Sequence, residues 1–395
     1  MALPRVLVLV LAGGAGSRLE LLTERRAKAA VPFAGVYRLI DVPLSNCQHS
    51  QLSDVWVTTQ FHPASLSKHL ANGRPWDLDR TSGGLMTLAP YRGDEREGWH
   101  DGTADSVWRN ADLVREHGAD ALVVLSADAV YRLDYRAVVD AHLESGVEVT
   151  MVTTQVDPED AGRYGVVSVG AGDQVTGYAY KPDDPDGSTV ANEVFVMTPG
   201  AVLDRLETLA QDVGEEGLQD LGTHLLPALA RDRAACAYPL DGYWRDVGTL
   251  EAYWQAHADF LGEAPPFDLD DPAWPVRSRG GRHAAARIEA GAQVERSLVS
   301  GGARVAGTVT GSVLSPGVVV EAGATVSDAV LLPGVLVRAG ATVTRAVLDD
   351  GVVVGEGATV GAEGGELALV GRQATVDGGS RVPAGGRLPE PEQGR

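Results

Sequence analysis

The C-terminal part of the chain carries an internal repeat, and this repeat restricts the fold more than any other feature of the sequence. Three segments of nearly identical pattern begin at Gly317, Gly334 and Gly351, so the spacing is 17 residues, twice over. The same step separates three valines that precede these glycines, namely Val313, Val330 and Val347. Short β-rich units with glycine corners at such a period are typical of a parallel β-helix, whose coils pack only on their neighbours. We therefore predict a left-handed parallel β-helix over residues 284–380.

Near the N-terminus, six consecutive aliphatic residues, Val6–Leu11, run almost directly into a turn that contains Gly13, Gly14 and Gly16. A continuous apolar run bounded by glycines is typical of a buried parallel strand. Glycines leave no Cβ atom to block a ligand, and the backbone N–H groups of such a turn can converge on an anion. Arg18 adds a planar cation that suits phosphate oxygens. The pattern favours a phosphate-binding loop, and its alternative is a tight strand-to-helix turn that binds nothing.

Predicted strands and helices alternate between this turn and about residue 260. The predicted strands are 54–59, 121–126, 147–154, 166–169 and 194–197, and the predicted helices are 106–117 and 134–144. Such alternation implies a largely parallel sheet covered by helices, in which ligands bind at the carboxyl ends of the strands. Asp128 closely follows one of these strands, as the glycine turn follows the first, so both can reach that edge.

The domain organisation follows from these patterns and from the segment between them. Four prolines and little periodicity mark residues 262–283 as a linker. We expect an α/β domain over 1–261, the β-helix over 284–380, and a disordered tail over 381–395, which is rich in proline, glycine and glutamate. No histidine follows His283. The C-terminal domain therefore lacks the base that many β-helix acyltransferases use, which favours a structural, oligomer-forming or regulatory role.

The charge of the chain limits its partners. A net charge of −21 disfavours nucleic acids and anionic membrane surfaces. Residues 1–40 are an exception, because they hold six basic and only two acidic residues. This basic segment is either a solvated face or a site for an anionic substrate. No apolar run is long enough to span a membrane, and two cysteines, Cys47 and Cys236, suit a reducing cytoplasm, where we expect the protein.

Several longer motifs resemble those of the glucose-1-phosphate adenylyltransferases, also called ADP-glucose pyrophosphorylases, and together they cover nearly the whole chain. They comprise the glycine turn with Arg26–Lys28, and the segments Tyr37–Asp41, Leu44–Cys47, Gly102–Asp105, Tyr243–Tyr253, Trp274–Arg277 and Ser297–Gly302. The resemblance implies a Rossmann-like, mostly parallel nucleotidyltransferase domain before the β-helix. It also implies a homo-oligomer, either a tetramer or a dimer.

The resemblance further implies a reaction in which a nucleoside triphosphate and a hexose-like 1-phosphate give a nucleotide sugar and pyrophosphate. The sugar phosphate oxygen attacks the α-phosphorus in line, so catalysis requires positioning and charge neutralisation. Arg18 and Lys28 would neutralise the leaving pyrophosphate, and Asp128 and Asp246 match the family's Mg²⁺ ligands. The residues expected at the nucleotide are Gly13, Gly14, Gly16, Gln60, Gly102 and Thr103, and those expected at the sugar phosphate are Lys181, Asn192 and Glu193.

Each of these roles has a plainer alternative. Without the resemblance, Asp128 can equally be the N-cap of a helix, Asp246 can cap a loop, and Lys181 can be a surface turn residue. The sequence also departs from the family pattern, mainly around the expected acceptor pocket. Tyr180–Pro182 stands where the family has Glu-Lys-Pro, and Ala191–Glu193 stands where it has Ser-Met-Gly. A pocket that binds particular hydroxyls loses that selectivity when its polar groups change.

Three functions fit these observations. The first is a nucleotidyltransferase with a cyclitol 1-phosphate acceptor; by resemblance to the valienol-1-phosphate guanylyltransferases, it converts valienol 1-phosphate to GDP-valienol in pseudosugar antibiotic biosynthesis. The second is ADP-glucose synthesis for glycogen, and the third is a catalytically silent regulatory subunit. The expected cations and metal ligands are all present, which disfavours the third. The acceptor motifs have changed, so we favour the first over the second, with the choice between GTP and ATP open.

Overall fold

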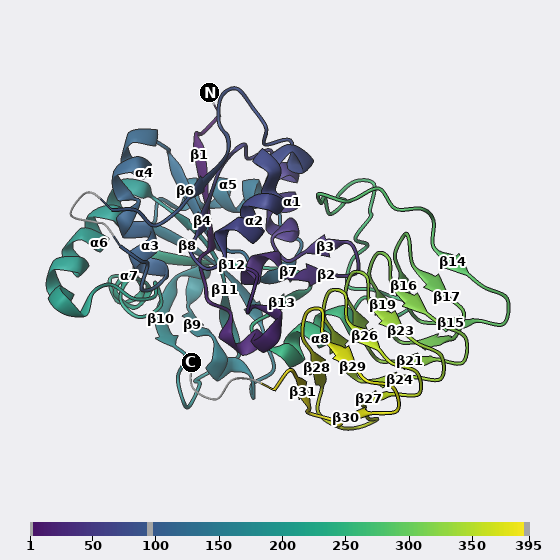
Figure 1. The fold of residues 1–395 in the computed structure, drawn as a ribbon. Helices are drawn as coiled ribbons and strands as arrows, with labels where there is room; N and C mark the ends of the chain where they lie inside the picture. Colours follow the sequence, from purple (N-terminus) through teal and green to yellow (C-terminus); the bar gives the residue numbers. More distant parts are fainter. Residues whose placement is uncertain (1–2, 93–97, 391–395) are drawn as a thin grey trace. The chain divides into compact units, whose positions relative to one another are not determined.

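The computed structural model describes residues 3–92 and 98–390 of the chain (Figure 1). Contacts within the chain divide it into two units, of which the first comprises Met1–Gly14 and Val42–Trp244 and the second comprises Ala15–Asp41 and Arg245–Arg395. This division differs from the expected order of an N-terminal domain, a linker and a C-terminal domain. Residues 15–41 and 245–261 group with the β-helix instead. Each unit is described by itself.

A nine-stranded sheet forms the centre of the first unit. Its strands are β1 (Val6–Ala12), β4 (Asp54–Thr59), β5 (Gly84–Leu88), β6 (Ala121–Ser126), β8 (Val149–Gln155), β9 (Gly165–Val169), β10 (Val175–Tyr180), β11 (Thr189–Met197) and β12 (Ala235–Pro239). The order β5-β4-β1-β6 is parallel throughout, whereas β11 runs antiparallel to β6, β8 and β9. The prediction of an α/β fold with a mostly parallel sheet is confirmed, and the buried apolar run is an interior strand that pairs with β4 and β6.

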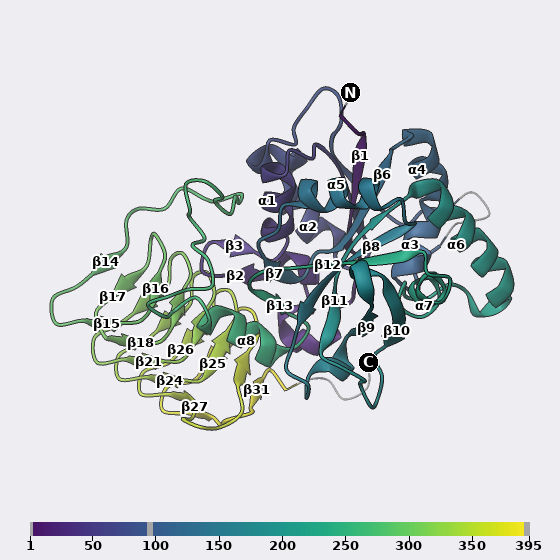
Figure 2. The ribbon, with the colours of Figure 1, turned by 180° about the vertical axis from the view of Figure 1, so that it is seen from behind.

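The helices of this unit cover the sheet (Figures 1 and 2). They are α1 (Asp41–His49), which begins at the last residue of the second unit, α2 (Pro63–Leu70), α3 (Thr103–Arg109), α4 (Ala111–His117), α5 (Tyr135–Ser145), α6 (Pro199–Val213) and α7 (Leu225–Arg231). The single helix expected over 106–117 is two helices, α3 and α4, which meet at Asn110. The Asn110 side chain donates to the carbonyl of Ser106 at 2.8 Å, a local bond that competes with the helical backbone pattern.

Three sheets of six short parallel strands make up the β-helix of the second unit, whose coils stack in Figure 1. One sheet holds β14 (Arg287–Ile288), β17 (Arg304–Val305), β20 (Val319–Val320), β23 (Leu336–Val337), β26 (Val353–Val354) and β29 (Thr375–Val376). The next holds β15 (Gln293–Glu295), β18 (Thr308–Thr310), β21 (Thr325–Ser327), β24 (Thr342–Thr344), β27 (Thr359–Gly361) and β30 (Arg381–Val382). The third holds β16 (Leu298–Val299), β19 (Val313–Leu314), β22 (Val330–Leu331), β25 (Ala346–Leu348), β28 (Ala368–Val370) and β31 (Arg387–Leu388).

The register of these sheets follows the sequence repeat. Val313 pairs with Val330, and Val330 pairs with Val347, so residues one repeat apart are neighbours on adjacent coils. The leucines that follow these valines, Leu314, Leu331 and Leu348, belong to a continuous apolar core of valine, leucine and alanine. Gly334 turns a corner with φ of 74°, a backbone conformation that glycine adopts without strain. The prediction of a left-handed parallel β-helix is confirmed, because three stacked parallel sheets are typical of that fold.

The end of the chain differs from the expected disordered tail over 381–395. Two segments of that tail, β30 and β31, belong to the last coil, and Val382 is buried there. The guanidinium of Arg387 donates to the carboxylate of Glu20 and to the carbonyl of Leu367. Proline and glycine serve as coil corners here, which composition alone does not distinguish from disorder. Residues 391–395 lie outside the described residues.

Residues 15–41 belong to the second unit because they contact residues that lie far away in the sequence. This segment contains β2 (Pro32–Phe33) and β3 (Tyr37–Arg38), and the following part of the unit contains the end of β13 (Trp244–Asp246) and α8 (Leu250–Ala258). From α8, the Tyr253 hydroxyl donates to the carbonyl of Pro32 at 2.6 Å. Arg26 pairs with Asp349 at 2.6 Å, across 323 residues of sequence. Neither contact has a local sequence pattern, so the sequence alone does not predict that these residues group with the β-helix.

Candidate active site

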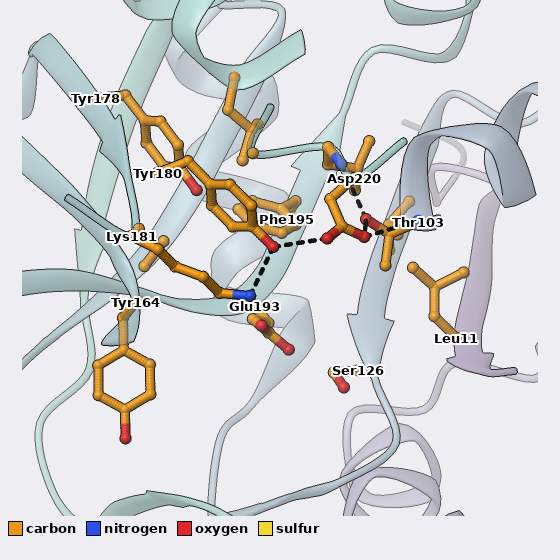
Figure 3. Close-up of a pocket in the computed structure, with 16 residues that line it drawn as sticks. Leu11, Thr103, Ser126, Tyr164, Tyr178, Tyr180, Lys181, Glu193, Phe195 and Asp220 are labelled. Carbon is orange, nitrogen blue, oxygen red and sulfur yellow. Dashed lines mark hydrogen bonds between the residues drawn. The ribbon is translucent and has the colours of Figure 1, made fainter. Parts of the chain in front are cut away.

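A cavity of about 160 Å³ opens in the first unit at the carboxyl ends of its central strands (Figure 3). Leu11 reaches it from the end of β1, and Ser126 from the end of β6. Tyr180 and its neighbour Lys181 come from the end of β10, and Glu193 comes from β11. This is the sheet edge at which the sequence predicts ligand binding.

A chain of hydrogen bonds runs along one wall of this cavity (Figure 3). Lys181 Nζ donates to the Tyr180 hydroxyl at 2.8 Å, and that hydroxyl donates to Asp220 Oδ2 at 2.7 Å. Asp220 Oδ1 accepts from the backbone N–H of Thr103 at 3.1 Å and from its hydroxyl at 3.3 Å. The Lys181 ammonium also lies 4.5 Å from the centre of the Tyr180 ring, within cation–π range. The wall therefore holds a cation and a carboxylate on either side of one phenol.

Burial raises the pKa of Tyr180, and the hydrogen bond to Asp220 raises it further. The phenol therefore stays protonated at neutral pH and donates to the carboxylate. Sequence reasoning missed Asp220, which lies 117 residues from its partner Thr103. No spacing rule connects two residues so far apart.

A local irregularity in β11 places Glu193 at the cavity. The pairing of β11 with β8 shifts between Ala191 and Phe195, and Glu193 has φ of 62°, in the left-handed region. Backbone in this region costs free energy in a residue with a side chain and is common at functional sites. Asn192 is buried beside it; its Oδ1 accepts from the backbone N–H of Val194, while its Nδ2 has no hydrogen-bond partner among the described residues.

Of the residues expected at the nucleotide, Gly13, Gly14, Gln60 and Gly102 lie in loops of the first unit, and Thr103 begins α3. A Cβ atom on Gly13 would lie 3.5 Å from Gln60 Cβ, and one on Gly14 would meet no described atom within 4 Å. Gln60 uses both ends of its amide on the backbone of His100, donating at 3.0 Å and accepting at 2.7 Å. It therefore fixes the segment that leads to Gly102. A Cβ atom on Gly102 would lie 2.3 Å from the Gln219 backbone, so only glycine fits where α3 begins.

Asp128 follows β6 and precedes β7 (Ala129–Tyr131), so the alternative that it caps a helix is wrong. Its Oδ1 accepts a hydrogen bond from the Ser126 hydroxyl. This bond orients one carboxylate oxygen at the end of the strand that also lines the cavity.

The second unit holds the remaining predicted residues. A Cβ atom on Gly16 would lie 3.0 Å from Lys28 Cβ, and Gly16 has φ of 70°, so the turn requires glycine there. A Cβ atom on Gly248 would lie 2.6 Å from Asp246 Oδ2 and 3.1 Å from Arg18 Nη2. Gly248 thus leaves room for a carboxylate and a guanidinium beside one another. Within this unit the structure brings Gly16 to Lys28, and Arg18 to Asp246.

The two predicted metal ligands, Asp128 and Asp246, belong to different units. Among residues 3–92 and 98–390, no three histidine, cysteine, aspartate or glutamate side chains gather in a way that could hold a metal ion. Mg²⁺ does not require such a cage, because it usually binds one or two carboxylates and completes its shell with water and substrate phosphates. Each aspartate is therefore a suitable ligand type for Mg²⁺.

Comparisons with known proteins identify the family of each part of the sequence. Residues 7–263 match the family described as nucleotidyl transferase, and residues 282–368 match the GlmU-like C-terminal hexapeptide family. The chain belongs to the nucleotidyl transferase family and is an enzyme of that type. Across the described part of the chain, no helix has the length and apolarity that a membrane span requires.

Three relatives in bacteria are named glucose-1-phosphate adenylyltransferase. The protein of Acetivibrio thermocellus is 37% identical over 320 residues, which cover 81% of this chain and 75% of the relative. That of Thermomicrobium roseum is 40% identical over 298 residues, covering 75% and 69%. That of Thermotoga neapolitana is 39% identical over 321 residues, covering 80% and 75%. These names correspond to the second of the three functions considered above.

Proposed function

We propose that the enzyme joins a nucleoside triphosphate to a hexose 1-phosphate and releases pyrophosphate, with ATP and glucose 1-phosphate as its substrates. The observation that carries this proposal is the cavity of the first unit, where the Lys181 ammonium and the Glu193 carboxylate lie beside aromatic rings. An ammonium attracts a phosphate, carboxylates accept hydrogen bonds from hydroxyl groups, and an aromatic face packs on the C–H face of a sugar ring. The names of the relatives support glucose 1-phosphate and ATP over other pairs.

The remaining residues fit the nucleotide and its leaving group. Gly13 and Gly14 offer open backbone after β1 for the triphosphate, and Arg18 and Lys28 would neutralise the pyrophosphate as its bond to the α-phosphorus breaks. Mg²⁺, held by Asp128 and Asp246, would supply further positive charge to the phosphates. No strong base is required, because the phosphate oxygen that attacks is already ionised. We also propose that the enzyme is a homo-oligomer and acts in the cytoplasm.

A second candidate keeps the reaction and changes the acceptor to a cyclitol 1-phosphate, such as valienol 1-phosphate with GTP. The observation that favours it is the altered wall of the cavity. By the resemblance described in the sequence analysis, Tyr180 occupies the place of a glutamate, and Asn192 and Glu193 replace parts of a Ser-Met-Gly motif. The names of the relatives give no support to this acceptor or to a role in antibiotic biosynthesis.

The test is a pyrophosphate-release assay with Mg²⁺, in which ATP or GTP is combined with glucose 1-phosphate or valienol 1-phosphate. We expect the highest kcat/KM with ATP and glucose 1-phosphate. Lys181→Ala should raise the KM for the acceptor, and Lys68→Ala, which removes an exposed lysine from α2, serves as the matched control. Preference for valienol 1-phosphate would establish the second candidate, and no pyrophosphate from any pair would exclude both.

A further inference from the structure

The Tyr180 hydroxyl lies between Lys181 and Asp220 in a position that the proposed reaction does not itself require (Figure 3). The Lys181 ammonium and the Asp220 carboxylate are linked by two hydrogen bonds to this hydroxyl, and the described structure shows no direct ion pair between them. The Tyr180 hydroxyl therefore donates to an oxygen of Asp220, a carboxylate that lines the cavity and could otherwise bind a ligand hydroxyl.

Asp220 has little hydrogen-bonding capacity left once the protein's own donors are counted. An ionised carboxylate accepts about four hydrogen bonds. Oδ1 receives two from Thr103, and Oδ2 receives one from Tyr180. Thr103 is itself held, because its hydroxyl accepts from the backbone N–H of Leu221 at 2.9 Å. The Thr103 contacts therefore fix the carboxylate, and the Tyr180 hydroxyl takes one of the two acceptor positions at Oδ2, on the side of Asp220 that lines the cavity.

We propose that Tyr180 determines acceptor specificity, because its hydroxyl takes the place at Asp220 Oδ2 that a ring hydroxyl of the acceptor would otherwise fill. The acceptor is then a hexose 1-phosphate in which the hydroxyl on the Asp220 side makes no hydrogen bond to this carboxylate. An analogue that lacks that hydroxyl is used as well as the parent sugar phosphate. This inference rests on the proposed function and narrows its acceptor class.

The test compares glucose 1-phosphate with its 2-, 3-, 4- and 6-deoxy analogues, each with ATP, in the wild-type enzyme and in Tyr180→Phe. The quantity measured is the ratio of kcat/KM for the parent to kcat/KM for each analogue. In the wild type, we expect one analogue to lie within about threefold of the parent. In Tyr180→Phe, we expect the ratio at that ring position to rise by about tenfold or more, because the parent hydroxyl now reaches a charged acceptor.

The ratio separates specificity from a general loss of binding. Tyr180→Phe also removes a contact of Lys181, but the phosphate is common to all acceptors, so that effect cancels. Tyr178→Phe is the matched control, since Tyr178 lines the same cavity and its hydroxyl takes no part in the described Lys181–Tyr180–Asp220 chain. Its ratios should equal those of the wild type, and the KM for ATP should not change in either variant.

Unchanged ratios in Tyr180→Phe would overturn the role of Tyr180, as would an equal shift in Tyr178→Phe. If Tyr180→Phe fails to fold, the wild-type series decides alone: a loss of about tenfold or more for every deoxy analogue would contradict the inference. Absence of turnover with every acceptor in the wild type would overturn the proposed function and this inference with it. Turnover with unchanged ratios would overturn only the inference.

Discussion

Each unit contains a cluster in which a cation meets carboxylates, and the two clusters are built in opposite ways. In the first unit, Lys181 is exposed and reaches Asp220 through a phenol at a cavity wall. In the second unit, Arg26 is 5% exposed and Asp349 only 1%, and their charged groups lie 2.6 Å apart. A buried pair satisfies its own charges, whereas charges at a cavity wall stay accessible to a polar ligand. The same residue types therefore suit a structural contact in the second unit and the proposed acceptor binding in the first, and burial distinguishes the two settings.

The largest expected effect is the loss of the buried pair. Asp349→Ala leaves the Arg26 charge buried, with only the longer 3.2 Å contact to Asp350, and should destabilise the second unit by about 3–5 kcal/mol. Urea unfolding monitored by circular dichroism measures the change. The matched control replaces both partners, as Arg26→Met with Asp349→Leu, and should cost much less because no unpaired charge remains. If the double variant is as unstable as Asp349→Ala, the unpaired Arg26 charge is not the cause of the lost stability.

For Asp128, a carboxylate at the carboxyl ends of the strands, we expect a loss of activity rather than a loss of stability. Asp128→Asn should lower kcat/KM by an amount equal to about 2–4 kcal/mol of transition-state stabilisation, because it removes one preorganised charge. Its unfolding midpoint should stay close to that of the wild type. Asp134→Asn is the matched control, since Asp134 is an exposed cap of α5 and asparagine caps a helix equally well. Full turnover by Asp128→Asn with Mg²⁺ would refute its proposed metal role.

The contrast between the units also explains how much the sequence could predict. The strands over 54–59 and 121–126 match β4 and β6 end to end, because short apolar runs between polar turns leave little choice of boundary. The coils were equally predictable, because each repeat pairs with the next at a fixed step. Local and periodic signals therefore account for the sheets of both units.

Contacts without such signals were missed. Arg26 and Asp349 lie 323 residues apart, and Asp220 and Thr103 lie 117 residues apart. Neither pair has a spacing that a helix or a strand would impose, so only the folded chain brings them together. The candidate site was found at all because a family resemblance supplied Lys181 and Glu193. The Asp220 contact that completes the cavity wall carries no such signal.

Each unit also contains a buried histidine, and burial makes the stability of the protein depend on pH. Burial lowers the pKa of His257 in the second unit and of His142 in the first, each to about 4. Both side chains are neutral when folded, and the unfolded chain takes up a proton below about pH 6.5. Stability is therefore complete above that pH and falls as the pH drops towards 4. For His257 alone, the loss between pH 7 and pH 4.5 should be about 2–3 kcal/mol.

Measuring the free energy of unfolding of wild type and His257→Gln at several pH values tests this point. Glutamine keeps a donor for the Tyr253 carbonyl, which His257 Nδ1 contacts at 2.8 Å, and does not titrate. The variant should lose part of the slope below pH 6.5 that the wild type shows. Equal slopes in the two proteins would mean that His257 is not kept neutral by burial.

The smallest expected effect concerns a purely local contact in the first unit. The Asp134 carboxylate accepts a hydrogen bond from the backbone N–H of Arg136 at 2.9 Å, at the start of α5. Asp134→Ala should cost about 1 kcal/mol of stability, because one N–H group at the helix N-terminus loses its acceptor. Asp134→Asn keeps an acceptor and should cost much less, as unfolding in urea would show. Helix α5 packs on β6, β8 and β11. If Asp134→Ala destabilises the protein as much as Asp349→Ala does, the cap must also stabilise the packing of α5 on these strands. The local contact and the long-range contacts would then not be separable.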